Sequence, residues 1–234
     1  MIRYDLRDSV AHIVLDTPGT SNRFTYSLMN NFIAALASAS ASGAAVLAIS
    51  AEGADFTLGR DQKEPQPDVG RRANLRLILR ANELLQGFPG VSVALIHGRS
   101  MGFGTGIALH SDISVAARSA VFGFDEIVHG LAPLVVLDYL PRYVGPKVAK
   151  ELVVTGRDVP AQEALALGLI NRVVDDEDLV ETGKALIARL SGFSPGALRL
   201  IQSFAVELEH VKGPDAGALA VDRLADWLEA GRPS

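Results

Sequence analysis

The chain has 234 residues, of which 48% are hydrophobic and 21% are charged, so it is long enough to bury a substantial core. Its net charge of −5, without a long basic run, argues against nucleic acid and anionic membranes as partners. The sequence contains no cysteine, which excludes disulfides, thiolate catalysis and cysteine-ligated metal. No apolar run approaches membrane-spanning length and no apolar signal segment opens the chain, so we expect a cytoplasmic protein.

Strand-like and helix-like patterns alternate over the first part of the chain. Short apolar runs predict strands, and apolar residues at helical spacing predict helices. The predicted strands cover residues 2–6, 10–15, 46–50, 91–96, 112–116 and 120–124, and predicted helices lie within residues 25–45 and 75–85. Beyond residue 133 the pattern is almost wholly helical, interrupted at residues 170–174. We therefore predict an α/β core over residues 1–175 and a helical C-terminal region over residues 176–234.

Two glycine-bearing turns each follow a predicted buried strand. The first covers residues 55–61 (DFTLGRD), and the second covers residues 97–104 (HGRSMGFG) and opens a helix-like segment. A glycine after a strand leaves backbone N–H groups unpaired, so that they can point at a ligand. Two converging N–H donors, one of them at a helix N-terminus, are what an enzyme needs to stabilise a developing oxyanion. The two turns therefore favour carbonyl chemistry.

Five segments carry a family resemblance. In chain order they are residues 56–64 (FTLGRDQKE), 97–112, 122–127 (FGFDEI), 152–164 and 168–174 (GLINRVV). Each is weak alone, but in this order they resemble the crotonase superfamily, the enoyl-CoA hydratases and isomerases, from about residue 2 to the C-terminus. The resemblance implies a spiral of stacked ββα units, an acyl-CoA thioester substrate and no cofactor beyond the coenzyme A of that substrate. It also implies a homotrimer or a hexamer of two trimers, with the apolar C-terminal helices contributing subunit contacts.

The resemblance also assigns the candidate site residues. The oxyanion donors would be the backbone N–H groups of Arg60 and Phe103, and the catalytic glutamate would be Glu126. The residues expected around the substrate are Gly59, Asp61, Gly102, Leu134 and His129. For Asp61 we also expect a structural role, because Asp side chains stabilise turns by bonding to nearby backbone. No set of His, Asp and Glu residues has the spacing of a metal site.

The chain departs from the family pattern at three places. Gly106 stands where the hydratases carry a second glutamate, and two carboxylates are what a water-adding enzyme uses to orient water and shuttle the proton. The isomerases of the family use a single glutamate, at the position of Glu126. Phe103 stands where a glycine is usual, and residues 134–136 (LVV) replace a small glycine-rich turn. Both changes are expected to add bulk near the thioester pocket.

Several functions agree with these residues. The leading prediction is a single-glutamate enoyl-CoA double-bond isomerase. Hydration by Glu126, alone or with an unidentified residue, is the first alternative, and decarboxylation or carbon–carbon cleavage of an acyl-CoA would use the same oxyanion hole. A protein that binds acyl-CoA or serves as an assembly subunit without chemistry is the alternative from another class. The glycines at residues 102–106 do not fit a dinucleotide-binding loop, since the third comes one residue early.

Overall fold

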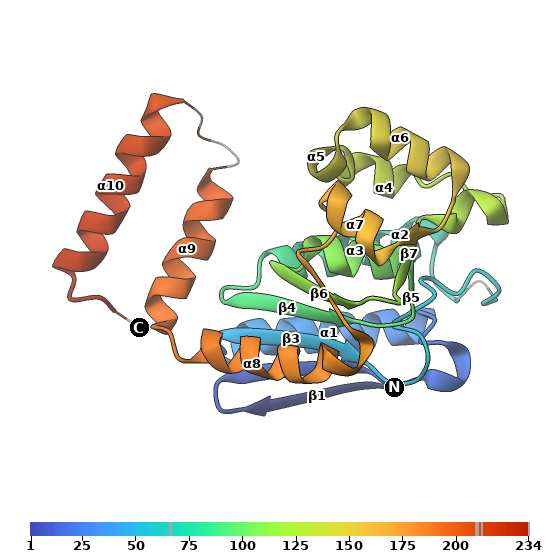
Figure 1. Cartoon of the computed structure of the whole chain (residues 1–234), viewed down its shortest axis with the longest axis horizontal. Coiled ribbons are helices and arrows are strands. Elements are labelled where there is room, and N and C mark those ends of the chain that lie inside the picture. The colour runs from blue at the N-terminus through green and yellow to red at the C-terminus, as the bar shows by residue number, and fades with distance from the viewer. Residues whose placement is uncertain (66, 209–210, 212, 234) are drawn as a thin grey trace.

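The main sheet of the computed structural model has six strands and forms the centre of the molecule (Figure 1). The structure describes residues 1–65, 67–208, 211 and 213–233. The sheet order is β1-β2-β3-β4-β6-β9, with β1 antiparallel to β2 and each later neighbour parallel. The strands are β1 (Ile2–Arg7), β2 (Val10–Leu15), β3 (Val46–Ala51), β4 (Val91–Ile96), β6 (Ile113–Ala117) and β9 (Arg172–Val174). Strands β2, β3 and β4 are almost continuously apolar because they are buried on both faces.

A second, three-stranded sheet carries the segments next to the site. It has the order β5-β7-β8 and consists of β5 (Arg99–Met101), β7 (Val121–Gly123) and β8 (Val159–Pro160). Strand β4 passes into β5 through Gly98, which has a φ of +57°. A β-carbon at Gly98 would lie 1.9 Å from the carbonyl oxygen of Ala54, so only glycine fits where this turn touches the first glycine-bearing turn. Neither β5 nor β8 was among the predicted strands.

The described part of the chain contains ten α-helices. They are α1 (Tyr26–Ala41), α2 (Arg71–Gln86), α3 (Phe103–His110), α4 (Leu134–Tyr139), α5 (Pro141–Val144), α6 (Pro146–Thr155), α7 (Ala161–Leu167), α8 (Leu179–Ser191), α9 (Pro195–Glu207) and α10 (Pro214–Glu229), with 3-10 turns at η1 (Pro18–Thr20), η2 (Asp125–His129) and η3 (Asp176–Asp178). Helix α1 begins where the Thr25 side chain accepts a hydrogen bond from the Leu28 N–H, at 3.1 Å. Its buried residues Phe32 and Leu36 face the core at helical spacing.

Of the three C-terminal helices, α8 covers the main sheet, whereas α9 and α10 extend away from it. Helix α8 packs on β3, β4 and β6 through buried leucines, and Gly183 leaves room there for the side chain of Leu95. Helices α9 and α10 form an antiparallel pair that projects from the body (Figure 1), joined by the ion pair of Arg223 with Glu207 at 2.7 Å. The exposed apolar residues of this pair include Ile201, Val206, Val221, Leu224 and Leu228.

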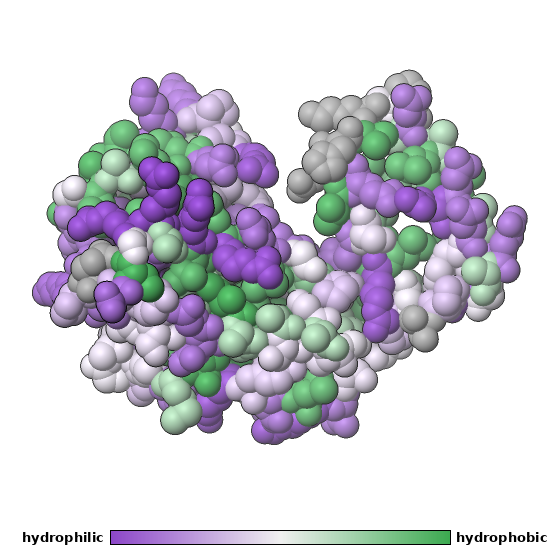
Figure 2. Space-filling model, turned by 180° about the vertical axis from the view of Figure 1, so that it is seen from behind, coloured by the Kyte–Doolittle hydropathy of each residue, from purple (hydrophilic) through white to green (hydrophobic). Residues whose placement is uncertain are grey.

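Apolar surface is also visible on the body itself. Figure 2 shows, from behind, a broad hydrophobic area on the α/β body beside the projecting helices. The segment that follows Glu126 contributes exposed apolar side chains at Ile127, Val128, Leu131 and Leu134. None of the helices in the described residues combines the length and hydrophobicity that crossing a membrane requires.

Candidate active site

The two glycine-bearing turns lie side by side, bonded through their backbones. The N–H of Thr57 donates to the carbonyl of Arg99 at 3.1 Å, and the N–H of Met101 donates to the carbonyl of Thr57 at 3.0 Å. The first turn therefore adds to β5 like a further parallel strand. Since β5 precedes α3 directly, this pairing places the first turn against the N-terminus of that helix.

Gly59 is the point of closest approach between the turns. Its φ is +71°, a backbone conformation that residues with a side chain rarely adopt. A β-carbon on Gly59 would lie 2.7 Å from the carbonyl oxygen of Met101 and 3.4 Å from the backbone nitrogen of Phe103. Gly59 therefore acts through its backbone, by allowing the turns that carry Arg60 and Phe103 to touch.

The backbone N–H groups of Arg60 and Phe103 have no hydrogen-bond partner within the described residues. Around Arg60, the carbonyl of Gly59 accepts from Phe24 at 2.8 Å and the N–H of Asp61 donates to Phe24 at 3.0 Å, which leaves only the N–H between them free. Phe103 is the first residue of α3, where N–H groups have no intrahelical acceptor and the helix dipole favours negative charge. Both N–H groups are thus available to a substrate oxygen; their convergence on one point stays a prediction.

The side chains of these two residues are held away from their N–H groups. The guanidinium of Arg60 donates to Asn74 Oδ1 of α2 at 2.8 Å. The ring of Phe103 is buried in an aromatic cluster, with its centroid 4.9 Å from that of Phe24 and 6.1 Å from that of Phe32. The core therefore accommodates the bulk that we expected Phe103 to add to the pocket.

Glu126 lies directly against the second turn. Its Oε1 is 2.8 Å from the position that a β-carbon on Gly102 would take, next to the donor residue Phe103. Its Oε2 is buried without a hydrogen-bond partner within the described residues. Burial raises the pKa of the Glu126 carboxyl, and the charge of Asp125 acts in the same direction. A carboxyl group with a raised pKa and a free oxygen beside an oxyanion site is a candidate general base.

The structure also places the other residues that were expected around the substrate. Asp61 accepts the N–H of Lys63 at 3.0 Å, which confirms its role in stabilising the turn. His129 is exposed and pairs with Asp125 at 3.2 Å. Leu134 is exposed at the start of α4. Contacts of Asp61, His129 and Leu134 with substrate stay predictions.

Gly106, which the resemblance places where the hydratases carry a second glutamate, is contacted by a residue that the sequence did not point to. A β-carbon on Gly106 would lie 3.1 Å from the hydroxyl oxygen of Tyr139, which comes from α4. Tyr139 is buried, and its ring packs edge-on against that of His110, with 4.5 Å between the centroids. Nothing in the spacing of residues 106 and 139 could have predicted this meeting, because it depends on how α4 folds back over α3.

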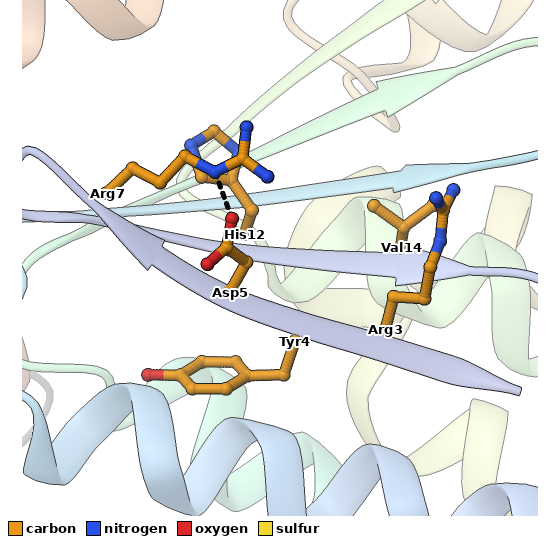
Figure 3. Close-up of a pocket in the computed structure, with 6 residues that line it drawn as sticks. All are labelled: Arg3, Tyr4, Asp5, Arg7, His12 and Val14. Atoms are coloured by element: carbon orange, nitrogen blue, oxygen red, sulfur yellow. Dashed lines mark hydrogen bonds and ion pairs between the residues drawn. The ribbon is translucent and has the colours of Figure 1, made fainter.

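Two surface cavities lie elsewhere. One, of about 540 Å³, is lined by Arg3, Tyr4, Asp5, Arg7, His12 and Val14 on the β1–β2 hairpin, where Arg7 pairs with Asp5 (Figure 3). The other, of about 640 Å³, lies between the end of α2 with the loop that follows it and the α9–α10 pair, and Trp227 is among its lining residues. Neither is lined by Glu126, Arg60 or Phe103. Among the described residues, no group of three or more His, Asp or Glu could hold a metal ion.

Comparisons with known proteins agree with this geometry. The sequence model of the family described as "Enoyl-CoA hydratase/isomerase" matches residues 5–216. A protein of Mycobacterium bovis named "Probable enoyl-CoA hydratase echA12" is 34% identical over 96% of this chain and 86% of that protein. The crystal structure of human enoyl Coenzyme A hydratase domain-containing protein 3 is similar with a TM-score of 0.91 and 25% identity, over 97% of this chain and 92% of that one. An enoyl-CoA hydratase structure from Bacillus anthracis has a TM-score of 0.88 and 26% identity, over 97% and 91% of the two chains.

A crotonase-type fold with two bonded glycine turns and a buried glutamate defines an enzyme of the hydratase and isomerase type. This chain belongs to the enoyl-CoA hydratase/isomerase family of the crotonase superfamily. The family resemblance and the fold class predicted from the sequence are thereby confirmed.

Proposed function

We propose that this protein is a single-glutamate enoyl-CoA double-bond isomerase. In this scheme the N–H groups of Arg60 and Phe103 donate to the thioester oxygen of a 3-enoyl-CoA. Glu126 takes a proton from the α-carbon, so that the α C–H bond breaks and an enolate forms. The same carboxyl group then delivers a proton to the γ-carbon, which moves the double bond to the 2-position and restores the ionised glutamate. Coenzyme A enters only as part of the substrate.

The observation that carries this proposal is that, among the described residues, Glu126 is the buried carboxyl group that lies against the second turn and keeps one oxygen without a hydrogen-bond partner. Glu126 touches Gly102, whereas Gly106, beside the hydroxyl of Tyr139, stands where the resemblance places a second glutamate. The neighbouring acids Asp61 and Asp125 are engaged by Lys63 and His129. One base suffices to move a proton between two carbons, since it is regenerated in each turnover, whereas addition of water also needs a group to activate the nucleophile.

Hydration is the second candidate, and it is favoured by the names of two similar proteins, the "Probable enoyl-CoA hydratase echA12" of Mycobacterium bovis and the enoyl-CoA hydratase of Bacillus anthracis. Under this alternative Glu126 would both activate water and supply the α-proton.

The test is a product analysis with purified protein and a panel of 2-enoyl-CoA and 3-enoyl-CoA thioesters of several chain lengths. We expect 3-enoyl thioesters to be converted to 2-enoyl thioesters, and 2-enoyl thioesters to gain little 3-hydroxyacyl product. Efficient hydration would contradict the isomerase proposal and support the alternative. Tight binding of the thioesters without any turnover would contradict both and leave a non-catalytic binding protein.

A homotrimer, or a hexamer of two trimers, is the assembly that we propose. The projecting α9–α10 pair supports it, since a monomer would leave the apolar side chains of Ile201, Val221 and Leu224 in water. Light scattering at micromolar concentration should give three or six times the chain mass of 24.8 kDa. A stable monomer at that concentration would contradict the assembly. The cytoplasmic location likewise stays a prediction.

A further inference from the structure

The hydroxyl of Tyr139 lies beside Gly106, the residue that by resemblance stands where a hydratase of this family carries a second glutamate. It is 3.1 Å from the position of a β-carbon on Gly106, and its ring carbon Cζ is 3.9 Å from the same point. A contact of 3.1 Å is tighter than almost all β-carbon contacts, so the hydroxyl would have to shift by a few tenths of an ångström, whereas 3.9 Å is ordinary van der Waals distance. The hydroxyl oxygen is therefore the atom that crowds this position.

The buried ring of His110 holds Tyr139 in place. Tyr139 ends α4 with 6% of its surface exposed. The ring of His110, one helical turn after Gly106 on α3, packs against it at an interplanar angle of 64°. His110 is fixed in turn by a hydrogen bond of 2.6 Å between its Nδ1 and Gln86 Nε2 of α2. Helix α3 thus has no glutamate at residue 106, and the ring of His110 on the same helix positions the hydroxyl of Tyr139.

The surroundings keep this hydroxyl neutral. Burial raises the pKa of Tyr139 well above its usual range, and the charge of Glu126 adds to the effect. Burial also lowers the pKa of His110 to about 4, so the imidazole is uncharged at neutral pH. A neutral phenol is a hydrogen-bond donor but cannot take a proton from water. The hydroxyl beside Gly106 is therefore not a base.

We propose that Tyr139 determines the reaction of this enzyme, because its hydroxyl crowds the space beside Gly106 that a second carboxylate would need, so that Glu126 works without a partner carboxylate there. This inference rests on the proposed function, since it explains why isomerisation would prevail over hydration. It assigns a specificity role to a residue that is remote from the glycine turns in the sequence.

Four proteins test it: the unmodified enzyme, Gly106→Glu, Tyr139→Phe and the double variant Gly106→Glu/Tyr139→Phe. The measured quantity is the ratio of hydration to isomerisation on the enoyl-CoA panel, which a general loss of folded protein leaves unchanged. Gly106→Glu alone should gain no hydration, because the hydroxyl obstructs the new side chain. The double variant should raise the ratio by about tenfold or more, since a second carboxylate gains room to activate water. The control is Gly106→Glu/Tyr143→Phe, which removes a hydroxyl that contacts His110 but lies more than 4 Å from the β-carbon position on Gly106.

An equal gain in Gly106→Glu alone, in the double variant and in the control would overturn the inference. Efficient hydration by the unmodified enzyme would instead overturn the proposed function. Because the glutamate variants can fail to fold, the melting temperatures of Gly106→Ala, Tyr139→Phe and Gly106→Ala/Tyr139→Phe form an independent cycle. We expect Gly106→Ala to lower the melting temperature less in the Tyr139→Phe background than in the unmodified protein. Strictly additive shifts would show that the hydroxyl does not crowd this position and would contradict the inference.

Discussion

Replacing Glu126 by Gln is expected to slow isomerisation of a 3-enoyl-CoA by about 10²-fold or more, because general base catalysis typically contributes 10²–10⁴-fold. The amide keeps the size of the side chain against Gly102 but cannot accept a proton. Substrate affinity should change little, since the oxyanion donors belong to the backbone of other residues. Steady-state kinetics with separate values for kcat and KM measure both effects. Unchanged kcat in Glu126→Gln would mean that another group is the base.

The pH dependence provides a second readout of the same group. Glu126 accepts a proton only when ionised, so kcat/KM should fall as the pH drops through its pKa. Since burial raises that pKa, the fall should begin at a higher pH than for an ordinary glutamate with a pKa of 4.5. Asp125→Asn is the matched control, because it removes a neighbouring negative charge that raises the pKa of Glu126. This variant should keep its activity at neutral pH and shift the acid limb to lower pH.

Replacing Gly59 by Ala is expected to lower kcat by about 10²-fold or more, the typical cost of losing one oxyanion donor. A methyl group at this position would stand 2.7 Å from the carbonyl oxygen of Met101, so the two turns must separate. Separation moves the N–H of Arg60 relative to that of Phe103, although neither residue is changed. The measurement is kcat for isomerisation, together with thermal unfolding to confirm that the variant is folded.

Gly43→Ala is the control for backbone strain. Gly43 has a φ of +74°, close to the +71° of Gly59, but a β-carbon there would meet nothing within 4 Å. Both variants should therefore lose about 1–2 kcal/mol of stability through the left-handed backbone. Gly59→Ala should in addition lose catalytic activity, whereas Gly43→Ala should keep it. Similar activity in the two variants would show that the approach of the turns does not matter for catalysis.

Several core strands and helices could be predicted from the sequence because burial alone explains their apolar patterns. The predicted strands at residues 10–15 and 91–96 coincide with β2 (Val10–Leu15) and β4 (Val91–Ile96), since both are buried apolar runs. Helix α7 (Ala161–Leu167) falls in the region beyond residue 133 that was predicted to be helical, and it ends at Gly168 in a left-handed conformation. Strands β5 and β8 were missed, because they are too short to show a period and one lies within a glycine-rich turn.

The site could be predicted in part. The resemblance pointed to Arg60, Phe103 and Glu126, and the structure brings Glu126 to Gly102 and the turn of Arg60 to the nitrogen of Phe103. Tyr139 could not be foreseen, because its approach to Gly106 depends on tertiary packing between α3 and α4. The burial of the Phe103 ring could not be predicted from the sequence either, since it depends on Phe24 and Phe32 from distant segments.

Glu126 and the two backbone N–H groups are expected to act together by forming an enolate at a thioester. Exchange of the α-proton of a saturated acyl-CoA with solvent deuterium tests it most directly, because this substrate can neither isomerise nor add water. Mass spectrometry should show deuterium at the α-carbon with the unmodified enzyme, and about 10²-fold slower incorporation with Glu126→Gln. A protein that binds the thioester but exchanges no α-proton, or that exchanges equally well after Glu126→Gln, would contradict the account.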